Sequence, residues 1–284
     1  MPSFSGVLSA RQINQVVAYV RGLCAAKDWP RGELNVPRAL ATEKAFPESE
    51  TVLTTTVNTR GPANVSNELV YEQILGKRDQ LEIAVPFGWA HQSSGALSGG
   101  LGDVVAGIKH VMFSNLSSGH DQPLYDSTGS ILSVQGEVSL PTGSVDKGLG
   151  TGETSFNAFA AYDQLFPAQT FMQLQAGADL PLHSHRAPRS AFFRSAFGKS
   201  FSGDVAGRLW SPMIEVLASR DLISGATTDW DVMPEFQVTL NRRQHIRAAL
   251  GYRIPVNDTA NRPRQVMAYF LWDWFDGGLF EGWR

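Results

Sequence analysis

Charged side chains recur on one face of several alternating apolar runs, and they are the residues of this sequence most able to do chemistry. Alternation places successive side chains on opposite faces of a β-strand. If such strands closed into a barrel with its apolar face outward, the charges would line a wet lumen. The residues expected there are Glu68, Glu72, Glu82, Lys109, Glu137, Glu215, Glu235, Arg247, Arg253 and Asp273.

Mixed glutamate and arginine on such a face favours a structural or selectivity role over catalysis. Charges that face a wet lumen cost little, whereas at the midplane of a lipid-facing surface each costs about 2–4 kcal/mol. Opposite charges can also form a network that narrows or plugs the pore. We therefore predict no catalytic residues among them and no enzymatic activity.

Other motifs give weaker signals. His183 and His185 form an H-x-H pair, with His120 elsewhere, but without further clustered ligands they indicate solvated loop residues and no metal site. The glycine-rich stretch 148–152 lacks the Lys-Ser/Thr pair of a phosphate loop and indicates a flexible turn. A G-x-S-x-G elbow is absent, although a hydrolase of the lipase-barrel type remains an alternative.

The composition narrows the possible classes. The chain has 284 residues, 43% of them hydrophobic, a net charge of −3 and one cysteine. These values exclude a disordered chain, a binder that relies on bulk basic charge and an intramolecular disulfide. There is no apolar run of about 18 residues, so no transmembrane helix is expected. A transmembrane β-barrel can have this average composition because its two faces alternate.

The chain changes character near residue 50. Ser9 and Gln12 have the spacing of a helix capping box. Apolar residues then follow at i, i+3, i+4 and i+7, which predicts a short amphipathic helix within residues 1–24. Residues 25–50 combine three prolines with scattered charge and no periodicity, and they indicate a linker.

From residue 51 the apolar period is 2, which predicts about twelve strands of a length suited to a tilted membrane span. The expected strands are 51–58, 63–74, 79–90, 102–114, 130–141, 154–165, 169–180, 189–202, 206–219, 229–240, 243–255 and 264–275, of which the first is weakest. Short connections alternate with longer ones, and aromatic residues gather at strand ends, as in outer-membrane barrels.

The predicted fold is therefore all-β, an antiparallel transmembrane β-barrel of about 12 strands over residues 51–284, preceded by a short N-terminal α-helix. The expected location is the bacterial outer membrane. The alternative is a soluble β-sandwich or lipocalin-like binding module, which would alternate with its apolar face inward.

Several stretches resemble a bacterial outer-membrane family labelled as the meta-pathway of phenol degradation. They are Gly102-Asp103 with Gly107 and Lys109, the run 137–143, the run 148–152 and Trp272-Asp273-Trp274. The resemblance covers about residues 60–284. It implies a porin or transporter that passes small compounds, hydrophobic or aromatic ones among them, with outer-membrane lipid and a small-molecule solute as partners and no nucleic acid.

Residues 1–24 resemble the C-terminal end of a class I cytochrome c, on Met1-Pro2-Ser3-Phe4, Leu8-Ser9, Gln12-Ile13 and the run 16–20. In that family a methionine at this place is an axial haem ligand, which would be Met1. The C-x-x-C-H attachment motif is absent and Cys24 stands alone, so this chain is expected to hold no cofactor.

The missing haem motif and the missing export signal suggest an N-terminally truncated chain. On this alternative, the chain is the barrel portion of a cytochrome c–porin fusion. Its full-length parent would carry haem c, work with a periplasmic cytochrome and transfer electrons across the outer membrane.

Overall fold

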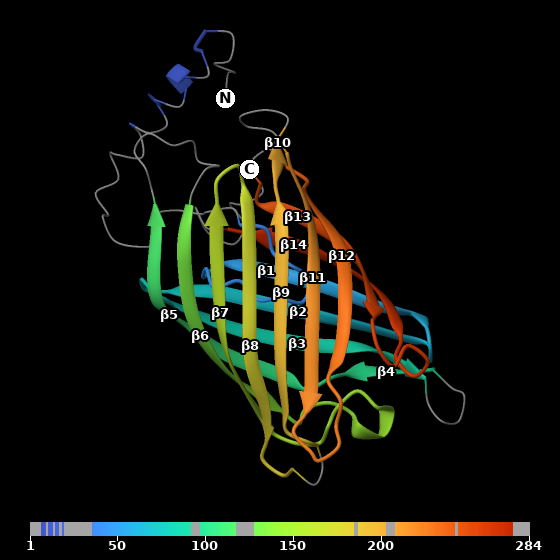
Figure 1. The fold of residues 1–284 in the computed structure, drawn as a ribbon. Helices are drawn as coiled ribbons and strands as arrows, with labels where there is room; N and C mark the ends of the chain where they lie inside the picture. The colour runs from blue at the N-terminus through green and yellow to red at the C-terminus, as the bar shows by residue number, and fades with distance from the viewer. Residues whose placement is uncertain are drawn as a thin grey trace.

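Twelve long antiparallel strands form a sheet that closes on itself in the computed structural model (Figure 1). The structure describes residues 7–9, 11–13, 15–16, 19, 36–91, 97–117, 128–184, 187–202, 208–241 and 244–274. Strand β1 pairs with both β2 and β14, and β11 pairs with both β9 and β12, so the ring has no free edge there. The predicted fold class is confirmed.

The strands of the ring are β1 (Glu50–Arg60), β2 (Asn64–Leu75), β3 (Asp79–His91), β5 (Val104–Ser117), β6 (Thr128–Leu140), β7 (Ser155–Phe166), β8 (Thr170–Pro181), β9 (Ser190–Lys199), β11 (Leu209–Asp221), β12 (Asp229–Thr239), β13 (Ile246–Pro255) and β14 (Arg264–Asp273). Two short strands, β4 (Leu97–Leu101) and β10 (Phe201–Ser202), pair with β3 and β11. A 3-10 helix, η1 (Val145–Lys147), lies between β6 and β7.

Each predicted strand overlaps one strand of the ring. The weakest prediction, 51–58, corresponds to β1, which has 11 residues and pairs along its length with β14. Its signal was weak because Thr54, Thr55 and Thr56 interrupt the apolar alternation. Threonine is β-branched and suits a strand on either face.

The alternation of side chains turns the polar face inward. Large apolar residues are exposed on the outside of nearly every strand, among them Leu53, Ile108, Phe156, Phe197, Trp210, Ile214 and Leu250. Polar residues on the opposite faces are buried, among them Gln80, Ser133, Gln173, Gln175, Ser211 and Gln237. This arrangement is the reverse of a soluble barrel, and the single closed sheet is not a sandwich.

The connections between strands lie at the two ends of the barrel. We call the end where β1 begins the plug end, after the buried segment described below, and the end where β1 finishes the distal end. Short turns 76–78 and 167–169 lie at the plug end, and the loops 141–154 and 182–189 lie at the distal end. Two connections break the predicted alternation. The turn 61–63 is short although it lies distally. At the plug end, β5 finishes at Ser117 and β6 begins at Thr128, so the connection between them is longer than a short turn.

The described part of the N-terminal segment begins with the predicted helical turn. The Ser9 amide donates to Gln12 Oε1 at 2.9 Å, and the Gln12 amide donates to Ser9 Oγ at 3.4 Å. These reciprocal hydrogen bonds form the capping box that the spacing predicted. None of the helical residues that the structure describes belongs to a helix long and apolar enough to span a membrane.

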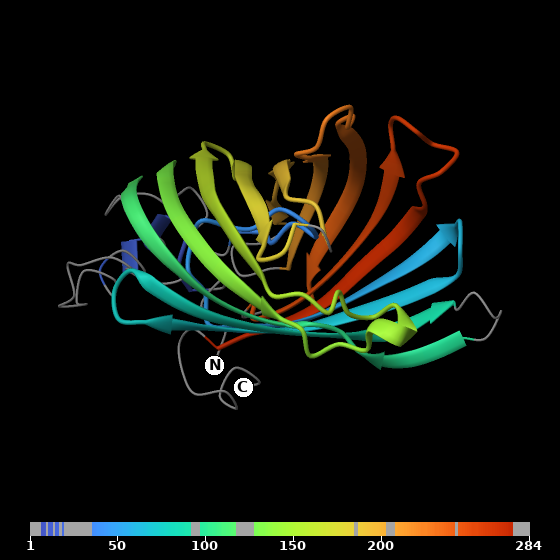
Figure 2. The ribbon, with the colours of Figure 1, turned by 90° about the horizontal axis from the view of Figure 1, so that it is seen from below.

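Residues 36–49, within the range predicted as a linker, run inside the ring of strands (Figure 2). Nearly all of them are buried, and they have no regular secondary structure. Their prolines and lack of periodicity suit an irregular chain whose hydrogen bonds go to surrounding side chains. We call residues 36–49 the plug.

Candidate functional site: the plugged lumen

Side chains on the inner face of the barrel, here called the wall, surround the plug. Their carboxylates and amides accept hydrogen bonds from backbone amides in the first half of the plug. The Arg38 amide donates to Gln237 Oε1 at 2.9 Å, and the Leu40 amide donates to Glu235 Oε2 at 3.0 Å. Glu215 accepts from the amides of residues 41 and 42 at 3.0 and 2.7 Å. An irregular segment needs such partners because an unpaired buried N–H is costly. The wall side chains thus supply the hydrogen-bond partners that regular secondary structure would otherwise give these backbone amides.

Other wall side chains donate to the carbonyls of the plug. Arg247 Nη1 donates to the Val36 carbonyl at 3.2 Å, and Gln173 Nε2 donates to the Pro37 carbonyl at 3.0 Å. The Tyr269 hydroxyl donates to the Arg38 carbonyl at 2.8 Å. Arg194 Nη1 donates to the carbonyl of residue 41 at 2.9 Å. These donors come from β13, β8, β14 and β9, so different parts of the ring hold the plug.

The second half of the plug combines polar and apolar contacts. Asp163 Oδ2 accepts from the Ala45 amide at 2.9 Å and the Phe46 amide at 3.3 Å. The Glu48 amide donates to Gln80 Oε1 at 2.7 Å. Phe46 is 1% exposed and packs in an apolar cluster with Val111, Ile131, Phe159 and Phe192. Burial of the aromatic ring adds an apolar anchor to this network.

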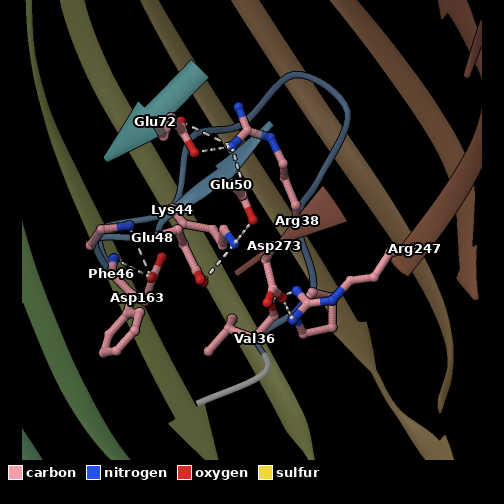
Figure 3. Close-up of polar contacts among 12 residues, drawn as sticks. Val36, Arg38, Lys44, Phe46, Glu48, Glu50, Glu72, Asp163, Arg247 and Asp273 are labelled. Carbon is pink, nitrogen blue, oxygen red and sulfur yellow. Dashed lines mark hydrogen bonds and ion pairs between the residues drawn. The ribbon is translucent and has the colours of Figure 1, made fainter. Parts of the chain in front are cut away.

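Ion pairs join the plug to β1 and β2 (Figure 3). Arg38 Nη1 lies 2.7 Å from Glu50 and 2.9 Å from Glu72, and its Nη2 lies 3.2 Å from Glu43. Lys44 Nζ lies 2.7 Å from Glu48 and 3.6 Å from Glu50. All these groups are buried or half-buried, so each charge depends on its partner.

The plug's own ionisable groups respond differently to this environment. Burial alone would lower the pKa of Lys44, but the carboxylates of Glu48 and Glu50 raise it above its ordinary value. Burial raises the pKa of Glu48, and Lys44 opposes the rise only in part. Burial would also raise the pKa of Glu43, but Arg38 and Lys109 hold it below its ordinary range. Lys44 and Glu43 are therefore charged at neutral pH.

The residues predicted to line the lumen take several distinct places. Glu72, Lys109, Glu215, Glu235 and Arg247 are buried and contact the plug. Asp273 is fully buried beside His245 and lies 3.2 Å from Arg247 Nη2, at the plug end of the barrel.

The remaining predicted residues form no direct hydrogen bond or ion pair with the plug among the described residues. Arg253 pairs with Asp231 at 2.6 Å, and Asp231 also pairs with Arg262. Glu82 and Glu137 both accept from Gln135 Nε2. Glu68 is half-buried on β2.

The list of expected lumen residues left out several other wall residues that bind the plug. Gln80, Gln173, Gln175 and Gln237 are all nearly fully buried and bind the plug, as does Asp163. A search for every polar residue in phase with the charged ones would have found them.

The weaker motifs belong to distal loops. His183 Nδ1 contacts Glu153 Oε1 at 2.7 Å, and its backbone amide donates to the same oxygen at 3.0 Å. Asp103 Oδ2 accepts from the amide and hydroxyl of Thr151, which fixes the glycine-rich turn. Met1, Cys24, His120 and His185 lie outside the described residues.

Comparisons with known proteins place the fold among outer-membrane channels. No family model and no curated protein sequence matches the chain. An outer membrane channel from Pseudomonas putida F1, of the COG4313 group, is 14% identical with a TM-score of 0.57, covering 84% of this chain and 100% of the other.

A second solved structure, the KdgM porin, is 7% identical with a TM-score of 0.48, covering 79% and 99% of the two chains. At these identities the first likeness establishes the fold alone. The resemblances to the phenol-degradation family and to cytochrome c stay predictions.

Proposed function

We propose that this chain is a bacterial outer-membrane channel for small solutes, and that its plug narrows the pathway. The observation that carries the proposal is the closed ring with an apolar outside and a polar, charged inside. A surface covered by exposed leucine, isoleucine and phenylalanine suits lipid and not water. A wall of glutamine, glutamate and arginine suits water and hydrophilic solutes.

The solute class follows from the same wall. We propose that solutes cross chemically unchanged, by passive diffusion through the part of the lumen that the plug leaves free. The polar wall favours small hydrophilic molecules. Small aromatic compounds, which the sequence resemblance implies, are the second class to be tested.

A transport assay separates these possibilities. The refolded full chain in proteoliposomes is expected to pass a small sugar such as arabinose slowly and a disaccharide more slowly. Charged phenol analogues test passage of the aromatic class, because they cross lipid poorly without a channel. Liposomes that are equally impermeable with and without the protein would refute the channel.

Placing a charge on the outer surface tests the membrane location. Leu250 lies mid-strand on β13 and is 59% exposed on the outer face. Leu250→Arg is expected to lower the free energy of unfolding by about 2–4 kcal/mol in lipid vesicles, because an arginine at the midplane loses its hydration. Urea unfolding of the barrel in vesicles measures the change.

Val256 gives the matched control. It follows the end of β13 at the distal rim and is 62% exposed. Val256→Arg is expected to cost about 0–1 kcal/mol, because the side chain reaches the polar interface. A cost of only about 0–1 kcal/mol at Leu250 as well would show that the outer surface faces water.

A further inference from the structure

Three carboxylates meet where the plug faces β2 and β3. Glu43 belongs to the plug, Glu72 to β2 and Glu82 to β3. One oxygen of each lies within 4.8 Å of the oxygens of the other two. Glu137 of β6 lies beside them, because Gln135 Nε2 donates to Glu82 at 2.9 Å and to Glu137 at 2.7 Å. We call Glu43, Glu72, Glu82 and Glu137 the carboxylate cluster.

The nearby cations leave part of this cluster uncompensated. Arg38 Nη1 binds Glu72, and its Nη2 binds Glu43 Oε1. Lys109 Nζ stays 3.7 Å from Glu43 Oε2, beyond hydrogen-bond length. Among the residues that the structure describes, Glu82 and Glu137 have no ion pair and share one amide donor. Unpaired buried carboxylates are costly, so a further positive charge is expected there.

A second observation points to a bound ligand. Gln135 is 3% exposed, and its side-chain oxygen has no hydrogen-bond donor among the described residues. The amide cannot be reversed to relieve this, since Nε2 must face the two carboxylates. Glu43 Oε2 is buried and likewise lacks a donor. Both are acceptor oxygens without donors on residues that belong to or contact the carboxylate cluster, and a hard cation can satisfy such oxygens.

We propose that the carboxylate cluster binds a divalent cation of the Ca²⁺ class, with Glu43, Glu72 and Glu82 as ligands and Gln135 Oε1 as a neutral oxygen ligand. Calcium binds oxygens at about 2.3–2.6 Å, so two ligands on opposite sides of the ion are about 5 Å apart. The three oxygens lie within 4.8 Å of one another, close enough to contact one such ion together. The ion would tie the plug to the wall, since Glu43 lies on one and Glu72 and Glu82 on the other.

Calorimetric titration of the detergent-solubilised full chain with Ca²⁺, after removal of metal by a chelator, tests the site. One Ca²⁺ per chain is expected, and Glu43→Gln or Glu82→Gln should weaken binding at least about tenfold, as loss of a metal-site contact does. Asp179→Asn is the matched control. This half-buried carboxylate on β8 bonds to Asn157 outside the cluster, and its loss should leave binding unchanged.

The outcomes separate clearly. No Ca²⁺ binding at millimolar concentration, or equal binding by wild type and Glu43→Gln, would overturn the site. Glu43→Gln alters only the plug, so heat-modifiable gel mobility should confirm a folded barrel. A role for the ion in holding the plug rests on the proposed function. If Ca²⁺ binds but its removal leaves conductance unchanged, the ion's role in holding the plug fails while the cation site stands.

Discussion

Deleting residues 36–49 is expected to raise the single-channel conductance several-fold. The plug occupies the lumen and contacts β2, β3, β7, β8, β9, β11, β12, β13 and β14, so its removal leaves a wider aqueous path. The ring itself should remain folded because its strands are paired all round. Planar-bilayer recordings of the refolded wild type and deletion variant measure the difference.

A second deletion provides the control for chain shortening. Removing residues 7–19 takes away the helical turn and leaves the plug, so the conductance should match the wild type. Equal conductance of the wild type and the 36–49 deletion variant would contradict the proposal that the plug narrows the pathway. Swelling assays with a disaccharide should follow the same order.

Arg38→Met is expected to displace the plug from the lumen. It removes a guanidinium that pairs with Glu43, Glu50 and Glu72, and it leaves buried carboxylates without their cation. Breaking a buried pair by removing one partner costs about 3–5 kcal/mol. If the plug left the lumen, water could reach these carboxylates and relieve this cost. We therefore expect the plug to be displaced. Conductance should then approach that of the 36–49 deletion variant.

Arg38→Lys separates loss of charge from loss of shape. Lysine keeps the positive charge but not the fork that reaches several carboxylates at once. Its conductance should lie between those of the wild type and Arg38→Met. Protection of the plug from added protease, measured on the same samples, should change in parallel. A low, wild-type conductance for Arg38→Met would show that this ion-pair network does not hold the plug.

The ring could be predicted from the sequence because lipid imposes a strict period on its strands. Each outward position must be apolar and each inward position can be polar, as along β11 and β12. The rule is local and needs no knowledge of which strands are neighbours. It weakened only where threonine, which suits both faces, fills β1.

The plug could not be predicted in this way. Its residues obey no period because each backbone group has a different partner on a different strand. Pro37 and Pro47 resemble linker residues for the same reason that they suit an irregular buried chain, since neither can donate a backbone hydrogen bond. The charged wall residues were accessible to sequence reasoning, whereas their common partner was not.

The most direct test of the central claim is whether residue 45 is shielded inside the native barrel. Ala45→Cys in a Cys24→Ser background places a thiol at a fully buried position of the plug. Asp146→Cys, on the exposed distal helix η1, is the control. A charged thiol reagent added to native membranes should label residue 146 rapidly, and residue 45 only after heat unfolding. Equally rapid labelling of residue 45 in the native barrel would contradict a plug formed by residues 36–49 and packed inside the lumen.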